Sequence, residues 1–498
     1  MPAGVTQTDH RFTTPYKTTA VHFTTLVLVF FFWGFVAASN DILIPVFKEK
    51  LHLEQWQSQM VSLAYYVAYT VGAIVYYFIS KWLKQDIISR LGYKNSIAWG
   101  LIISALGTLL FYPAAESESF LLMISGLFIV GLGFSLQQMA ANPLAIVLGD
   151  PKGGAKRLSL AGGINNFGTT IGPLIVSFAI FGTLNTEGTT VASINAVKTP
   201  YLLLGLAFVV VAVIFRFSSL PGRVTAPADT SLVPPEDATL AINIKSKRSA
   251  FHYTQLSLGM IAIFVYVGVE VSTASNLPEL IKHTMNLETG KIAPYISLYW
   301  ASLMIGRWTA SVSIFNVRPA MRRLLNVLVP YIAFVVFLLV NRIANHDITP
   351  FYIYAPVILV MIAGDFLSKG NPARQLLIFS GLAIVALLVG IIAGGMTSVF
   401  AFISVGLFCS TLWPCIFTLA IAGLGKHTNE GSSLLIMMCM GGGILSLLQG
   451  WLAKDSLLGI HYSYFVGVAG FLYLVFYAIK ARSVLRSQGI DYDVAANP

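Results

Sequence analysis

The stretch Trp33–Pro45 reads WGFVAASNDILIP and places one carboxylate, Asp41, inside the first long apolar segment. On membrane-insertion scales a carboxylate in mid-bilayer costs about 2.5–3.5 kcal/mol, so it is rarely kept without a use. Asn40 precedes it and Pro45 follows, which favours a helix that bends or loosens beside a cavity. The stretch therefore predicts a transmembrane helix that carries an ion or substrate site.

The composition extends this prediction to the whole chain. Its 498 residues are 56% hydrophobic and 10% charged, with a mean hydropathy of +0.76, whereas soluble proteins carry about 25% charged residues. A span needs roughly 20 apolar residues. Runs of that length recur without the period-two alternation of barrel strands. We therefore predict an all-α polytopic membrane protein embedded in a lipid bilayer.

We expect about fourteen transmembrane helices from these apolar runs. Their predicted bounds are 21–47, 57–80, 94–113, 120–147, 157–183, 200–219, 253–280, 292–316, 323–341, 349–366, 373–394, 396–423, 430–453 and 461–480.

The basic residues support this count. With a cytoplasmic N-terminus, 23 of the 31 Lys and Arg residues fall on the inner side, 7 fall on the outer side, and Arg307 lies within a span. This is the positive-inside pattern, and it places both termini in the cytoplasm. The net charge of +10 is thus a feature of membrane topology, and we expect no nucleic-acid partner.

Two bundles are predicted on either side of a linker. Residues 220–252 are rich in proline and mixed charges and separate an N-terminal six-helix bundle, 1–219, from a C-terminal bundle, 253–498. Short matches between the halves, such as Ala-Ser-Asn at 38–40 and at 274–276, indicate a duplicated bundle. The surplus spans form a predicted two-helix hairpin inserted at about 323–366.

Ionisable residues within the spans are the first candidates for function. Asp41 is expected to bind the coupling ion, and Glu270 is a second intramembrane carboxylate with a coupling or substrate role or, alternatively, a structural one. Arg307 is expected to be structural or to act in gating. Asp86 and Arg90, in the loop after the second span, are read as topology determinants or as an inner latch.

Carboxamides are the second group of candidates, because they both donate and accept hydrogen bonds and so suit sugar hydroxyls. The same groups also join helices in membranes. Gln138 and Asn142 share a helix face, whereas the adjacent Asn165 and Asn166 point in different directions. The predicted substrate-binding residues are Asn40, Tyr66, Gln138, Asn142, Asn165, Asn166, Glu270 and Asn276.

Enzyme chemistry finds no support in the sequence. We find no phosphate loop, metal-ligand cluster or nucleophile motif, and the three cysteines, Cys409, Cys415 and Cys439, lie in apolar runs. We therefore expect no enzyme activity, no cofactor and no metal.

The chain resembles the fucose:proton symporter family of the major facilitator superfamily over nearly all spans except 323–366. The matching pieces are Trp33-Gly34-Phe35, Asn40–Pro45, Tyr66, Tyr69, Ala140–Pro143, Leu148-Gly149, Arg157-Leu158, Asn165, Phe167-Gly168, Tyr266–Gly268, Gly306-Arg307, Pro414, Ile416-Phe417, Gly431–Ser433 and Gly441–Gly443.

This resemblance implies a two-bundle, alternating-access transporter in which Asp41 is the proton-coupling aspartate. Gln138 stands where the fucose branch has glutamate and the glucose/galactose branch usually has glutamine. Gly268–Ser272 reads Gly-Val-Glu-Val-Ser, similar to the glucose/galactose branch. The implied activity is proton-coupled uptake of a neutral hexose such as glucose or galactose.

Sodium coupling and export of an amphipathic small molecule are the alternative functions. We further expect a monomer in a bacterial inner membrane.

Overall fold

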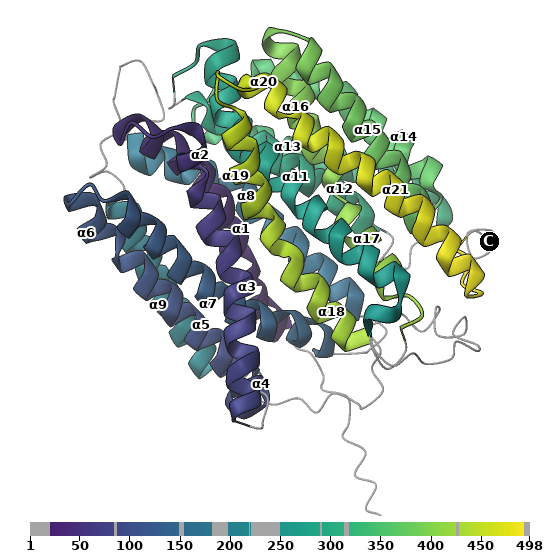
Figure 1. Ribbon diagram of the computed structural model, residues 1–498, viewed down its shortest axis with the longest axis horizontal. Coiled ribbons are helices and arrows are strands. Elements are labelled where there is room, and N and C mark those ends of the chain that lie inside the picture. The colour runs from purple at the N-terminus through teal and green to yellow at the C-terminus, as the bar shows by residue number, and fades with distance from the viewer. Residues whose placement is uncertain are drawn as a thin grey trace, which may run out of the picture.

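The computed structural model describes residues 20–83, 87–148, 154–181, 198–218, 220, 250–288, 291–312, 318–424 and 428–492, which form helices and no strand (Figure 1). The predicted linker 220–252 lies almost wholly outside these residues. The first half contains α1 (Ala20–Lys50), α2 (Gln55–Ser58), α3 (Met60–Trp82), α4 (Ile87–Leu91), α5 (Tyr93–Leu109), α6 (Phe111–Glu116), α7 (Phe120–Val147), α8 (Gly154–Phe181) and α9 (Lys198–Phe217).

The second half follows the same helical plan with more interruptions. It contains η3 (Ala250–His252), α11 (Thr254–Met285), α12 (Ala293–Ser311), α13 (Pro319–Ile343), η6 (Thr349–Tyr354), α14 (Ala355–Ser368), α15 (Pro372–Ile392), α16 (Gly395–Cys409), α17 (Leu412–Ile421), α18 (Thr428–Met437), η8 (Met438–Met440), α19 (Gly441–Leu452), α20 (Gly459–Ser463) and α21 (Phe465–Ser487). We call the two ends of the molecule the α2 end and the α4 end, after the short helices that lie there in Figure 1.

All fourteen predicted spans coincide with helices, and twelve segments of the described chain are long and apolar enough to cross a membrane. The other two predicted spans are α8 and α12. At 1.5 Å per residue, even the 19 residues of α12 reach about 28 Å. These two helices pack against each other between the halves, where the polar side chains of Asn166, Thr170 and Ser297 hydrogen-bond within the protein.

Several spans that the sequence presents as single helices are interrupted, and two of them lie near the centre of the second half. The span predicted at 396–423 divides into α16 and α17, and the span predicted at 430–453 divides into α18, η8 and α19. The loosening expected around Pro45 does not occur, because α1 stays helical from Ala20 to Lys50. A proline removes one hydrogen bond, and the remaining bonds of this long helix maintain it.

The contacts between helices follow the predicted repeat. Within the first half α1 packs along α8, and within the second half α11 packs along α19. Across the halves, α8 packs on α12 and α3 packs on α19. If α1, α3 and α8 correspond to α11, α12 and α19, each contact maps onto another contact of the same set, as expected for a duplicated bundle.

Glycines bring α1 and α8 unusually close. A Cβ atom on Gly34 would lie 1.9 Å from the Asn165 carbonyl oxygen, and a Cβ atom on Gly168 would lie 2.2 Å from the Phe31 carbonyl oxygen. Real atoms cannot approach this closely, so the absence of side chains at these positions sets the distance between the helices. This pairing holds the Trp33–Pro45 stretch against α8.

The inserted hairpin consists of α13, η6 and α14 and lies against α12 and α15. The Tyr354 and Ser302 hydroxyls hydrogen-bond at 2.8 Å, which joins η6 to α12. Gln375 of α15 donates to the Asp365 carboxylate of α14 at 3.2 Å. The hairpin is therefore fastened to the core by polar contacts as well as by apolar packing.

Candidate functional site

Glu270 lies half-buried in the middle of α11 and is the centre of a polar cluster in the second half. The Tyr266 hydroxyl, one turn earlier, lies within hydrogen-bond reach of both the Glu270 carboxylate and the Cys409 carbonyl oxygen, the latter at 3.1 Å. Tyr299 of α12 donates to the Glu270 backbone carbonyl at 2.7 Å. Three helices thus meet around one carboxylate.

Arg307 belongs to the same cluster, and the interruption between α16 and α17 supplies one of its hydrogen-bond acceptors. Pro414 has no N–H with which to bond the carbonyl oxygen four residues earlier, that of Ser410. Arg307 Nε donates to this carbonyl oxygen instead, at 3.3 Å. The guanidinium also donates to Asn166 Oδ1 of α8 at 3.2 Å and interacts electrostatically with Glu270. Arg307 therefore connects the two halves at the level of the buried carboxylate.

Tyrosines and Gln138 form a matching cluster in the first half. The Tyr69 hydroxyl interacts with the Gln138 side chain and lies 3.1 Å from the Tyr65 hydroxyl. The Tyr66 and Tyr69 rings stack with centroids 6.2 Å apart. A phenol and an amide side by side offer hydrogen bonds and a flat apolar surface, which is what a sugar ring needs.

The two clusters approach each other at α19. The Tyr66 ring packs against Gly442, since a Cβ atom there would lie 3.1 Å from it. The Cys439 side chain lies near both Tyr69 and Glu270. The structure therefore brings Tyr66 and Gln138 of the first half toward Glu270 of the second.

The other predicted carboxamides lie in different surroundings. Asn166 faces Arg307, whereas Asn165 donates to the Phe30 carbonyl oxygen of α1 at 2.9 Å, so the two neighbours point apart as expected. Asn142 is half-buried one turn beyond Gln138 on α7. Asn166 is thus tied to the second half, while Asn165 is tied to α1.

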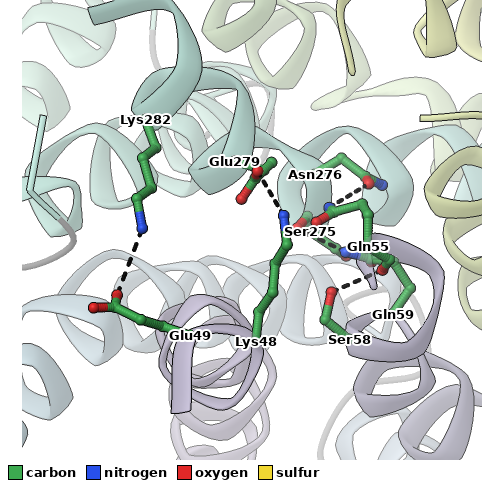
Figure 2. Close-up of polar contacts among 9 residues, drawn as sticks. All are labelled: Lys48, Glu49, Gln55, Ser58, Gln59, Ser275, Asn276, Glu279 and Lys282. Atoms are coloured by element: carbon green, nitrogen blue, oxygen red, sulfur yellow. Dashed lines mark hydrogen bonds and ion pairs between the residues drawn. The ribbon is translucent and has the colours of Figure 1, made fainter. Parts of the chain in front are cut away.

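Asn276 lies less than two turns beyond Glu270 on α11 and belongs to a contact between the halves at the α2 end. Its Oδ1 accepts a hydrogen bond from Gln55 Nε2 at 3.0 Å, and Gln59 Nε2 donates to the Ser275 carbonyl oxygen at 3.2 Å (Figure 2). The Ser62 and Ser275 hydroxyls lie 3.1 Å apart. In this conformation Asn276 holds the halves together and is fully buried.

Ion pairs surround this contact and were not predicted. Lys48 of α1 lies 2.5 Å from Glu279 of α11, and Figure 2 shows it beside the Glu49–Lys282 pair, whose atoms are 3.5 Å apart. A third pair, Lys454 with Glu54, measures 2.5 Å. The sequence presents these lysines only as charges beyond the ends of spans, so their partners could not be assigned.

Some predicted residues are not described in full. Asn40 and Asp41 lie in the helical backbone of α1, but their side chains fall outside the described residues, as does all of Asp86. Arg90 is exposed on α4. Their proposed roles in ion binding and in an inner latch remain predictions.

A helical bundle with two similar halves and an ionisable polar cluster between them is typical of membrane transporters. The Major Facilitator Superfamily matches residues 26–368. The chain belongs to this superfamily, and it is therefore a membrane transporter and not an enzyme.

Known proteins similar to the chain include a glucose/galactose transporter of Brucella abortus biovar 1 (strain 9-941), which is 32% identical over 472 residues, 94% of this chain and 96% of the relative. The L-fucose-proton symporter of Escherichia coli (strain K12) is 25% identical over 451 residues, 88% and 87% of the two chains. The crystal structure of the transporter FucP in the outward conformation aligns with a TM-score of 0.59 at 23% identity, covering 93% of this chain and 99% of that one.

Proposed function

We propose that this transporter couples proton entry to uptake of a neutral hexose such as glucose or galactose. The observation that carries the proposal is the position of Tyr266 between the Glu270 carboxylate and the Cys409 carbonyl oxygen. The names of the relatives, a glucose/galactose transporter and an L-fucose-proton symporter, support both the substrate class and the ion.

A single proton on Glu270 changes what Tyr266 does. A phenol has one hydrogen to donate, so an ionised Glu270 takes it and leaves the Cys409 carbonyl oxygen without that donor. A protonated Glu270 donates to Tyr266, which then donates to Cys409. The proton thus changes the hydrogen bonding of the helix interruption between α16 and α17, and this change favours one conformation over the other.

Arg307 extends the same switch to the first half. An ionised Glu270 attracts the guanidinium, and a neutral Glu270 leaves it to its bonds with Ser410 and Asn166. Since Asn166 belongs to α8, protonation alters a contact between the halves. A sugar held between Gln138, Tyr66 and this cluster binds the protonated protein best, and that difference in affinity produces coupling.

Asp41 is proposed to take part as the first proton acceptor, as the resemblance implies. In this proposal, protonation removes a buried charge, which allows the site to close, and deprotonation at the inner side resets it. Because Gln138 cannot be protonated, Glu270 is the partner of Asp41 in this proposal.

The proposed topology places the α2 end outside the cell and the α4 end in the cytoplasm. It follows from the distribution of Lys and Arg, and it puts both termini inside. The two bundles, 1–219 and 253–498, are proposed to rock about the central site as a monomer in the bacterial inner membrane.

Counterflow in proteoliposomes with a panel of hexoses tests the proposal. Wild-type protein should exchange glucose or galactose and accumulate it when a pH gradient is applied. Asp41→Asn should still exchange the sugar but fail to concentrate it. Absence of hexose exchange would refute the substrate, and accumulation driven by a sodium gradient but not a pH gradient would refute the ion.

A further inference from the structure

The contact between the halves at the α2 end contains buried polar atoms that other described residues do not satisfy. We call this group of residues the amide junction; it comprises Gln55, Gln59, Ser62, Ser272, Ser275, Asn276 and Gln449. Among the described residues, no hydrogen-bond partner exists for Gln55 Oε1, Gln59 Oε1, Ser272 Oγ, Gln449 Nε2 and Gln449 Oε1. Gln59, Ser272 and Gln449 are 0% exposed and Gln55 is 7% exposed.

These atoms lie together because of the way α19 packs on α11. Gly441 contacts the Phe264 backbone, and Leu445, one turn further along α19, contacts Gly268, one turn further along α11. The next turn of each helix brings Gln449 level with Ser272. The neighbouring Gly450 packs on Gln59, since a Cβ atom there would lie 2.6 Å from Gln59 Cγ.

A buried polar atom without a partner costs about 1–3 kcal/mol, so a group of five such atoms in one place points to a ligand that satisfies them. The side chains are uncharged and present both donors and acceptors, which matches water better than a cation. A buried water requires two to four polar partners, and the amide junction offers that number.

We propose that water molecules fill the amide junction and thereby keep the free-energy cost of opening the α2 end low. When the halves separate, its polar atoms exchange trapped water for bulk water, so opening loses little hydrogen bonding. An apolar contact of the same size would lose its burial on opening. The proposal rests on the proposed alternating access of the transporter, but not on its sugar or ion.

The chain contains a matched control at its α4 end. Gln255 is also 0% exposed, but its Nε2 donates to the Ala422 carbonyl oxygen at 3.0 Å and to Gln488 Oε1 at 3.1 Å, while Gln488 Nε2 donates to Gln255 Oε1 at 3.1 Å. Gln449 and Gln255 are therefore two glutamines that are equally buried. They differ in whether other described residues hydrogen-bond to their side-chain amides.

The test replaces each glutamine by methionine, which has a similar length and no strong polar atoms. Hydrogen exchange of the full-length protein in lipid nanodiscs, followed by mass spectrometry, reports how often segments 53–63 and 270–280 open. Gln449→Met should slow exchange there by roughly tenfold, because the atoms that favour opening are gone. Gln255→Met should instead lower the melting temperature.

Unchanged or faster exchange in Gln449→Met, or a fall in melting temperature equal to that of Gln255→Met, would overturn the proposal. Ser272→Ala makes a smaller change at the same place and should also slow exchange. It decides the question if the methionine variant does not fold. Neither measurement requires added sugar, so failure of this inference is distinguishable from failure of the proposed function.

Discussion

Arg307 donates a hydrogen bond to Asn166 Oδ1 at 3.2 Å and thereby joins α12 of the second half to α8 of the first. The two residues are far apart in sequence and are held in register by the glycine-mediated packing of α8 and by the interruption before α17. This bond connects the carboxylate cluster to the half that carries Gln138.

Replacing Arg307 by lysine should slow sugar exchange by about tenfold, because lysine keeps the charge but loses the planar group that reaches two acceptors. Initial counterflow rates measure this effect. Trp308→Phe is the control: it removes one long bond, 3.4 Å from the indole nitrogen to the Gly163 carbonyl oxygen, on the same helix. Equal losses in both variants would contradict a special role for Arg307.

Glu270→Gln should weaken the dependence of sugar exchange on external pH and abolish uptake driven by a pH gradient. The amide donates to Tyr266 as a protonated carboxyl would and cannot lose its proton. Uptake and exchange are measured in the same vesicles. Glu288→Gln, at an exposed residue 3.9 Å from Lys291, should leave both intact, and persistent proton-driven accumulation in Glu270→Gln would rule out its coupling role.

The hairpin contact between Tyr354 and Ser302 should contribute about 1 kcal/mol to stability. Tyr354→Phe and Ser302→Ala are each expected to lower the melting temperature. The double variant should be no less stable than the worse single one, because both changes remove the same bond. Strictly additive losses would show that the two hydroxyls act separately.

Gly168→Ala should severely destabilise the protein, because its methyl group would collide with the Phe31 carbonyl oxygen 2.2 Å away. Gly162→Ala, on the same helix, meets nothing within 4 Å and should be neutral or stabilising by up to about 1 kcal/mol through helix propensity. Expression level and melting temperature distinguish the two. Similar behaviour of both variants would mean that α1 and α8 can move apart.

Acid should loosen the Glu54–Lys454 pair. Hydrogen bonds from Lys454 and then from Trp56 hold the pKa of Glu54 below its ordinary value of 4.5, so the pair supports the closed α2 end fully above pH 4.5. This support is lost as the pH falls through the lowered pKa. Protection of residues 54–59 from hydrogen exchange, relative to Glu54→Gln, should decrease over that range, and a constant ratio would argue against the pair.

Hydropathy predicted the helices well because each span is a local property of the chain. The span predicted at 120–147 coincides with α7 (Phe120–Val147), and the hairpin expected at 323–366 is present as α13, η6 and α14. The interruption between α16 and α17 was missed, since apolar residues continue across it. The effect of Pro414 depends on Arg307, which replaces the lost hydrogen bond from another helix.

The sequence predicted single residues of the candidate site, but it did not predict the contacts that join them. Glu270 and Arg307 were recognisable because charge is rare within spans. Their connection to Tyr266 and Asn166 required the folded arrangement. Gln449 and Gln59 were overlooked, because an uncharged glutamine in an apolar helix hardly changes hydropathy and only burial shows whether its amide is satisfied.

The contact between α1 and α8 cannot be altered by a series of compensating substitutions. A clash between two side chains can be relieved by a compensating substitution in either one, but Gly34 and Gly168 face backbone carbonyl oxygens, which no substitution can shorten. Glycine is therefore the one residue that fits at positions 34 and 168 of this interface. Adaptation to a new substrate must come from the surfaces that line the gap between the halves, with the α1–α8 pair inherited as a fixed part.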